Sequence, residues 1–138
     1  YAKSEAEFNG IKIKQTTDYP LKGKIKISVS GKCEGKKLAL RIPGWCQKFT
    51  LKVGTTAVKA KPIDGFIYIP IEKKTLSLEL NLEMKAVLNE ANPLIDQIFG
   101  RVAVSYGPFI YCLEDIDIDN RISEIALSKT LNETVKYV

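Results

Sequence analysis

The sequence contains no histidine, and its only methionine is Met84. Without an imidazole, the chain cannot build Ser-His-Asp or Cys-His nucleophile sets, histidine acid–base catalysis or histidine-based zinc sites. Residue 1 is Tyr1 rather than methionine, so we expect the sequence to be a piece of a longer protein. The lack of a signal peptide then says nothing about the compartment of that protein.

Cysteine is scarce as well: Cys33, Cys46 and Cys112 are odd in number and far apart. This spacing fits neither a paired disulfide framework nor a CxxC metal knuckle. We expect small, buried hydrophobic side chains at these positions. A bridge from Cys46 to either of the other two stays open, as does the redox state of all three.

Long apolar runs are missing, so no membrane partner is predicted. The net charge is +5, but many lysines fall on every second position, as in residues 11–14 and 24–27. This placement puts lysines on the solvent face of strands, where they also discourage edge-to-edge pairing. No arginine cluster or RNA-binding aromatic motif occurs, so nucleic acid is not a predicted partner.

Alternation of apolar and polar residues runs through most of the chain, and Gly, Pro or Lys-Gly turns bound each run. The clearest case is residues 75–84, where five apolar residues occupy every second position and could not form one helical stripe. We predict an all-β fold: an antiparallel, jelly-roll-like β-sandwich of about eight to ten strands. It forms a single domain over residues 1–138, with residues 1–8 a linker or a short helical turn from a preceding domain.

Asp115, Asp117 and Asp119 alternate as the first ligands of an EF-hand do, but Asn120 and Ala126 stand where that loop needs Gly and Glu. We therefore predict no metal site, and expect a strand end with the carboxylates exposed and Ile116 and Ile118 buried.

Glycoside hydrolysis needs two carboxyl groups about 5 to 10 Å apart, and the glutamates here lie in strand flanks or charged turns that give no reason for a raised pKa. We predict no catalytic residue among them (Glu72, Glu79, Glu83, Glu90 and Glu114).

Sugar rings stack on exposed aromatic side chains, so the aromatic residues of this chain are candidates for sugar binding. Trp45 follows a Pro-Gly turn and could either plug the sandwich or face a ligand. The candidate ligand-binding residues are Tyr19, Trp45, Tyr68 and Tyr106, with Phe66 and Tyr111 as further aromatic residues.

Five stretches resemble motifs of glycoside hydrolase family 127, whose members include β-L-arabinofuranosidases, and they occur in the family's order. Two differences stand out: Leu21 replaces a usual tryptophan, and Tyr106 replaces a usual arginine, so the substrate is not carried over. The matching stretches are 17–20 (TDYP) with 23–29, 38–45 (LALRIPGW), 65–69 (GFIYI), 76–84, and 91–93 with 100–114 (GRVAVSYGPFIYCLE).

The resemblance implies a C-terminal β-sandwich region, a divergent member of this bacterial family, that supports an upstream (α/α)6 catalytic barrel. It places a cysteine nucleophile, a cysteine-rich zinc site and an acid/base glutamate in that barrel, and none of these motifs occurs here. The isolated chain is thus expected to be a non-catalytic accessory domain with no cofactor of its own.

The expected partners are the barrel of the same polypeptide, a second copy in a homodimer, and a plant-type oligosaccharide. The alternative function is a carbohydrate-binding module, which requires at least two of the four candidate aromatic residues to be exposed and roughly coplanar. The parent could be periplasmic, secreted or cytoplasmic.

Overall fold

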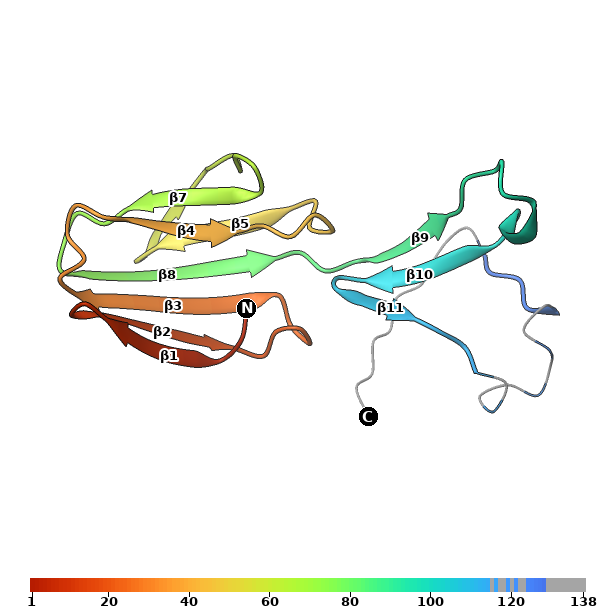
Figure 1. The fold of residues 1–138 in the computed structure, drawn as a ribbon, viewed down its shortest axis with the longest axis horizontal. Helices are drawn as coiled ribbons and strands as arrows, with labels where there is room; N and C mark the ends of the chain where they lie inside the picture. The colour runs from red at the N-terminus through yellow and green to blue at the C-terminus, as the bar shows by residue number, and fades with distance from the viewer. Residues whose placement is uncertain (115, 117–118, 120, 122–123, 129–138) are drawn as a thin grey trace. The chain divides into compact units, whose positions relative to one another are not determined.

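The computed structural model describes residues 1–114, 116, 119, 121 and 124–128. These residues form eleven strands, all paired antiparallel, one 3-10 turn at Asp96–Ile98, and no α-helix (Figure 1). The all-β, antiparallel class is confirmed. No helix in this part of the chain is long and apolar enough to cross a membrane. The strands are β1 (Ser4–Phe8), β2 (Ile11–Thr17), β3 (Lys24–Gly31), β4 (Lys37–Arg41), β5 (Phe49–Val53), β6 (Thr56–Val58), β7 (Phe66–Pro70), β8 (Thr75–Leu82), β9 (Ala86–Glu90), β10 (Val102–Tyr106) and β11 (Phe109–Tyr111).

The chain divides into two compact units, residues 1–84 and 85–138, where one domain was expected. The buried side chains explain the division, because every described hydrophobic side chain in the buried core precedes Met84. Unit 1 therefore has its own buried core.

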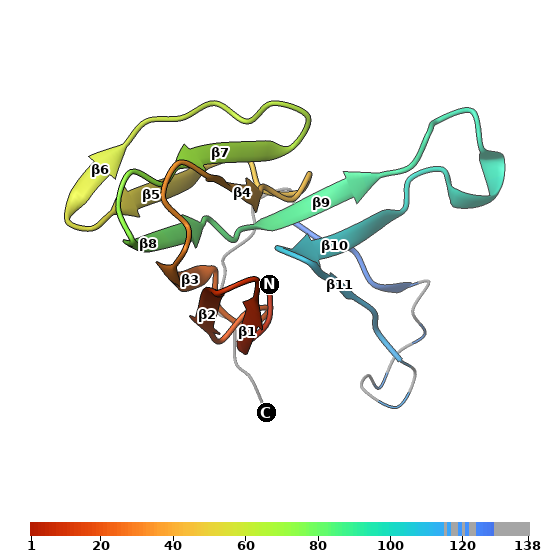
Figure 2. The ribbon, with the colours of Figure 1, turned by 60° about the vertical axis from the view of Figure 1, so that its left-hand side comes forward.

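Unit 1 contains a six-stranded sheet in the order β1-β2-β3-β8-β5-β6 and a two-stranded sheet, β4-β7. Figures 1 and 2 show β4 and β7 lying beside β5 and β8. Both sheets contribute side chains to one buried cluster, as in a β-sandwich. The jelly-roll-like connectivity stays a prediction.

The core of unit 1 follows from the period-two pattern. Leu80 of β8 lies opposite Ile25 of β3 and Leu51 of β5, and all three are at most 2% exposed. The two-stranded sheet adds Leu40 and Ile67, each 2% exposed. Burying side chains of this size contributes about 1.5–3 kcal/mol each, so the strand alternation seen in the sequence supplies the main stabilising term.

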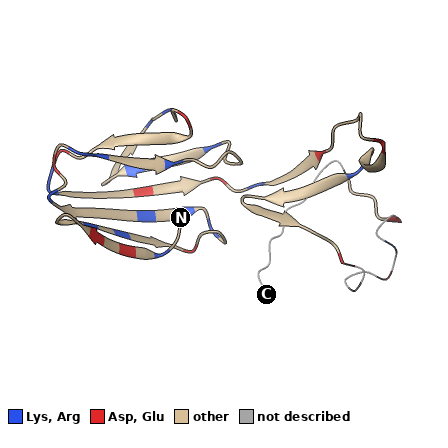
Figure 3. Cartoon of the chain, in the orientation of Figure 1, with Lys and Arg blue, Asp and Glu red and all other residues tan. Residues whose placement is uncertain are grey.

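Lysines occupy the solvent face of the six-stranded sheet, as predicted, and Figure 3 shows basic and acidic residues together on its strands. Lys12 and Lys14 of β2 lie 2.5 and 3.6 Å from the Glu5 carboxylate of β1, and Lys24 of β3 lies 3.0 Å from Glu79 of β8. Solvent reaches all of these groups and screens their attraction, so the pairs contribute little to stability.

Residues 4–8, where a linker or helical turn was expected, form strand β1 at the edge of the six-stranded sheet. All five residues of β1 are exposed, and it pairs with β2 from Ser4↔Gln15 to Phe8↔Ile11. Because β1 buries no side chain, burial in the core does not explain its pairing with β2. The cross-strand attraction between Glu5 and the lysines of β2 favours this pairing instead.

Unit 2 is built on a three-stranded antiparallel sheet in the order β11-β10-β9. Asn89 donates from its side chain to the Ser105 hydroxyl at 2.9 Å, across β9 and β10. Ile110 of β11 is 78% exposed. No described hydrophobic side chain in unit 2 is fully buried, so the sheet leaves apolar surface uncovered by the described part of the chain.

Two of the three carboxylates expected at a strand end, Asp115 and Asp117, lie outside the described residues, as does Asn120. Ile116 is described and is 88% exposed, so the expectation that it is buried was wrong. Ile118 also lies outside the described residues.

Candidate functional site

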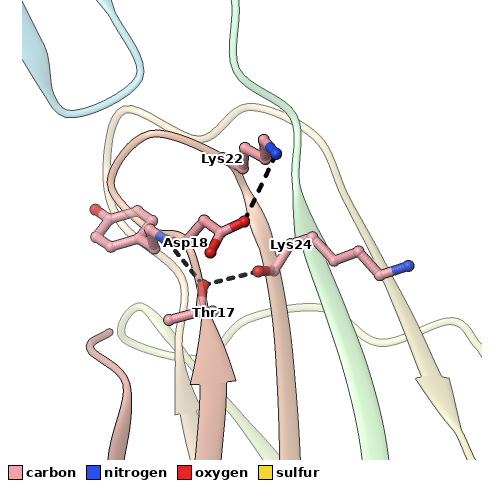
Figure 4. Close-up of polar contacts among 5 residues, drawn as sticks. Thr17, Asp18, Lys22 and Lys24 are labelled. Carbon is pink, nitrogen blue, oxygen red and sulfur yellow. Dashed lines mark hydrogen bonds and ion pairs between the residues drawn. The ribbon is translucent and has the colours of Figure 1, made fainter. Parts of the chain in front are cut away.

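The TDYP motif forms the turn between β2 and β3 (Figure 4). The Thr17 hydroxyl donates to the Lys24 carbonyl at 2.7 Å and accepts from the Tyr19 backbone N–H at 2.9 Å. The Lys22 ammonium lies 3.6 Å from the Asp18 carboxylate, and the Tyr19-Pro20 peptide bond is cis. One hydroxyl thus acts as donor and acceptor and fixes both sides of the turn. The motif has a structural role here.

Tyr19 is half-buried and packs on the core of unit 1. Its ring meets that of Tyr1 edge to face, with centroids 6.1 Å apart and an interplanar angle of 83°. The Tyr1 hydroxyl donates to the Arg41 carbonyl at 2.6 Å, and burial raises the pKa of Tyr1 to about 12. An edge-to-face pair that packs on a core does not offer two parallel faces to a sugar.

Trp45 lies in the turn after Ile42 and is also half-buried against the core. The turn closes where the Cys46 N–H donates to the Pro43 carbonyl at 3.0 Å. This position agrees with the interpretation of Trp45 as a plug of the sandwich.

Tyr68 is the exposed candidate of the four, at 51%. It lies on the outer face of β7 beside Phe66, with ring centroids 6.4 Å apart and an interplanar angle of 35°. The Arg41 guanidinium of β4 lies 5.9 Å from the centre of the Phe66 ring. This surface combines an exposed ring with a cation.

Tyr106 belongs to unit 2, where it is half-buried on β10 opposite Ala86 and Phe109. Tyr111 of β11 is 49% exposed. The three candidates in unit 1 do not form one platform, since Tyr19 and Trp45 pack on the core and Tyr68 faces outward. Arg41 was not among the candidates predicted from the sequence, although its place on β4 opposite Phe66 follows from strand pairing.

A cavity of about 490 Å³ opens in unit 1 beside the β5–β6 turn, the end of β7 and the start of β8. Its lining is largely aliphatic and includes one carboxylate, Glu72, and one ammonium group, Lys73. A single carboxylate is not the pair that glycoside hydrolysis requires.

Among the described residues, two carboxyl groups have clearly displaced pKa values, and both are lowered. The Lys12 ammonium hydrogen-bonds Glu5 and lowers its pKa, and the Lys24 ammonium does the same for Glu79. A general acid in glycoside hydrolysis needs a raised pKa, so neither group is suited to that role.

The three cysteines are free thiols. Cys33 and Cys46 are buried, as expected of small hydrophobic side chains, while Cys112 is exposed, which corrects that expectation for one of the three. The Cys46 thiol donates to the Lys48 carbonyl at 3.1 Å, and burial raises the pKa of Cys46.

Zinc is implied by the family resemblance only for the catalytic barrel. Among the described residues, no three Cys, Asp or Glu side chains come close enough together to hold a metal ion. The residues of this part of the chain therefore do not fit that zinc site.

Comparison with known protein families assigns the two units to two domains of one family. Residues 1–84 match the family described as "Beta-L-arabinofuranosidase, GH127 middle domain", and residues 86–138 match the "Glycoside hydrolase family 127 C-terminal domain". The boundary between the two matches coincides with the boundary between the two compact units.

Similar proteins agree with this assignment. The non-reducing end β-L-arabinofuranosidase of Bifidobacterium longum subsp. longum is 32% identical over 124 residues, which cover 85% of this chain and 19% of that protein. A crystal structure of a GH127 β-L-arabinofuranosidase from Geobacillus stearothermophilus T6 superposes with a TM-score of 0.73 at 31% identity, covering 82% of this chain and 19% of that one.

A solved structure described as a glycoside hydrolase gives a TM-score of 0.71 at 34% identity, covering 80% of this chain and 19% of that one. The chain thus spans about a fifth of the length of these relatives. It belongs to glycoside hydrolase family 127, and it comprises the family's non-catalytic middle and C-terminal domains.

Proposed function

We propose that this chain is the accessory part of a β-L-arabinofuranosidase-like glycoside hydrolase and that it stabilises an upstream (α/α)6 catalytic barrel in the same polypeptide. The similar enzymes are about five times longer than this chain, and domains of this type normally belong to a longer polypeptide with such a barrel. The chemistry belongs to the barrel, and the chain described here supplies packing surface.

The uncovered apolar surface of unit 2 is the observation that carries the proposal. Val87 of β9 and Ile110 of β11 both lie opposite Ser105 of β10, so they share one face of the small sheet, and they are 39% and 78% exposed. A three-stranded sheet needs a packed apolar face for stability, and exposed apolar patches mark protein contact sites. We therefore expect part of this surface to lie against another region of the parent polypeptide.

A single substitution, Ile110→Asp, tests whether this face contacts another part of the parent polypeptide or faces solvent. In the isolated chain the side chain is already 78% exposed, so its replacement changes the free energy of unfolding by less than about 0.5 kcal/mol. In the full-length parent, burying an unpaired carboxylate at a domain contact lowers stability by about 1–3 kcal/mol. Thermal unfolding of both forms, with and without the substitution, measures the difference.

An equal and small effect in the isolated chain and in the parent would contradict the supporting role at this position. Activity gives a second check: the isolated chain should hydrolyse aryl arabinofuranosides at the rate of buffer alone. Turnover close to that of the parent would overturn the accessory function. The homodimer stays a prediction, to be tested by the molar mass of the parent in light scattering.

A further inference from the structure

The outer face of the β4-β7 sheet is a surface that the supporting role leaves unexplained. Alternation turns Leu40 and Ile67 into the core, so the remaining positions of β4 and β7 point away from it. We call these positions the outer face. They are Lys37, Ala39 and Arg41 on β4, and Phe66, Tyr68 and Pro70 on β7.

The aromatic part of the outer face is open to solvent. Tyr68 is 51% exposed, and the residue directly opposite it is Ala39, whose side chain is too small to cover the ring. Phe66 lies alongside at 6.4 Å between ring centres and 35° between ring planes. A flat aromatic ring beside a small side chain leaves room for the face of a ligand ring to stack on it. An apolar side chain of a peptide would instead need a pocket, which this flat surface does not provide.

The charged part of the outer face has one sign. Arg41 and Lys37 flank Ala39 on β4, about 7 Å from it on either side by strand geometry, and no carboxylate shares this face. Among the described residues neither cation takes part in an ion pair. Arginine binds carboxylates through two parallel hydrogen bonds, so the guanidinium beside Phe66 is suited to an anionic ligand.

We propose that the outer face binds a sugar chain that carries carboxylate groups, with a sugar ring stacked on Tyr68 over Ala39 and the carboxylates paired with Arg41 and Lys37. The choice of a sugar rests on the proposed function, since the parent is a glycoside hydrolase. The choice of an acidic one rests on the two unpaired cations. Binding here would hold the parent on its polymer without contributing to the chemical step.

Nuclear magnetic resonance titration of the isotopically labelled chain tests the site residue by residue. The probes are the tetramer of galacturonic acid and a neutral arabino-oligosaccharide of the same length. We expect millimolar affinity for the acidic tetramer, with shifts confined to residues 37–41 and 66–70, and weaker binding of the neutral probe. Raising the salt concentration should weaken binding of the acidic probe alone.

Matched variants identify the contacts. Tyr68→Ala should weaken binding about 3- to 10-fold, as expected for loss of one ring contact, and Arg41→Gln should weaken it and reduce its salt dependence. Tyr111→Ala and Arg101→Gln remove an equally exposed tyrosine and an exposed arginine from unit 2, and binding should be unchanged. The spectrum of each variant shows directly that unit 1 is still folded.

Several outcomes would overturn the proposal: shifts outside the two strands, equal affinity for both probes, or equal losses in the variants of unit 1 and unit 2. Absence of shifts at 10 mM probe, about ten times a 1 mM dissociation constant, would do the same, and it would leave the outer face as a surface for protein contact. Because the readout is binding to this chain, the result does not depend on whether the supporting role in the parent is correct.

Discussion

Replacement of Gly23 by alanine should destabilise unit 1 more than any surface substitution in the chain. Gly23 joins the TDYP turn to β3, and its carbonyl accepts from the Leu82 N–H at 2.9 Å. A Cβ atom at position 23 would lie 1.9 Å from the Leu82 carbonyl oxygen. That oxygen belongs to the backbone of β8, so relief requires the two strands to separate.

The expected cost follows from these contacts. Separating the strand ends weakens one backbone hydrogen bond, about 1 kcal/mol, and the crowding itself costs about 1–3 kcal/mol. Leu82 is only 2% exposed, so its packing moves with its backbone. We expect a loss of about 2–4 kcal/mol in the free energy of unfolding, a large part of the roughly 5–15 kcal/mol that stabilises a domain.

Urea unfolding followed by the emission of Trp45 measures this loss, because Trp45 is the single tryptophan and packs on the core of unit 1. Gly44→Ala is the matched control: no atom lies within 4 Å of its added Cβ, and its φ is not positive. The control should stay within about 0.5 kcal/mol of the original chain. If Gly23→Ala unfolds at the same urea concentration as Gly44→Ala, the close approach of β3 and β8 at this point is refuted.

Three further outcomes are expected. Leu80→Ala should cost about 2–5 kcal/mol, because Leu80 is fully buried between the sheets, whereas Leu21→Ala, at 44% exposure, should cost under about 1 kcal/mol; equal urea midpoints would argue against a shared core. An aromatic disulfide reagent should label one thiol, Cys112, rapidly in the native chain and all three in urea, and rapid labelling of a second thiol would be inconsistent with this fold. Tyr1 keeps its proton to about pH 12 when folded but loses it near pH 10 when unfolded, so its contribution to stability is present below pH 10 and is lost as pH rises to about 12. Tyr1→Phe should remove that part of the pH dependence, and a wild-type-minus-variant difference that stays constant from pH 9 to pH 12 would contradict it.

The sequence predicted the strands whose apolar residues alternate cleanly. In β8 the pattern of residues 75–84 correctly placed Leu78, Leu80 and Leu82 in the core. It did not predict β1, because the apolar residues of 4–8 are few and all five residues stay exposed. The signal for β1 was the two acidic residues of 4–8 facing a lysine-bearing strand, which becomes visible only once the register with β2 is known.

The candidate site was harder to predict for a related reason. Alternation in residues 66–70 showed that Tyr68 and Ile67 point to opposite faces, but not which face the second sheet would cover. Pairing with β4 decides this, and it also brings Arg41 beside Phe66 from 25 residues away. The division into two units was hidden as well, because the apolar pattern continues past Met84 into β9 and β10 although no described hydrophobic residue there is fully buried.

In the RIPGW motif, residues 41–45, the backbone and the two apolar side chains have structural roles that the Arg41 side chain does not share. Ile42 is 7% exposed and donates its N–H to the Gly65 carbonyl at 2.7 Å, and Trp45 packs on the core after the turn. The backbone of Arg41 has a structural role too, since its carbonyl accepts from Tyr1. Its guanidinium does not: it lies exposed over Phe66, with no ion pair in the described part of the chain. If the motif served packing alone, Arg41→Gln would change neither stability nor ligand binding. If the Arg41 side chain binds the ligand, the same substitution weakens binding of the acidic sugar and leaves stability unchanged. The second result would distinguish a binding role of this side chain from the structural role of its neighbours.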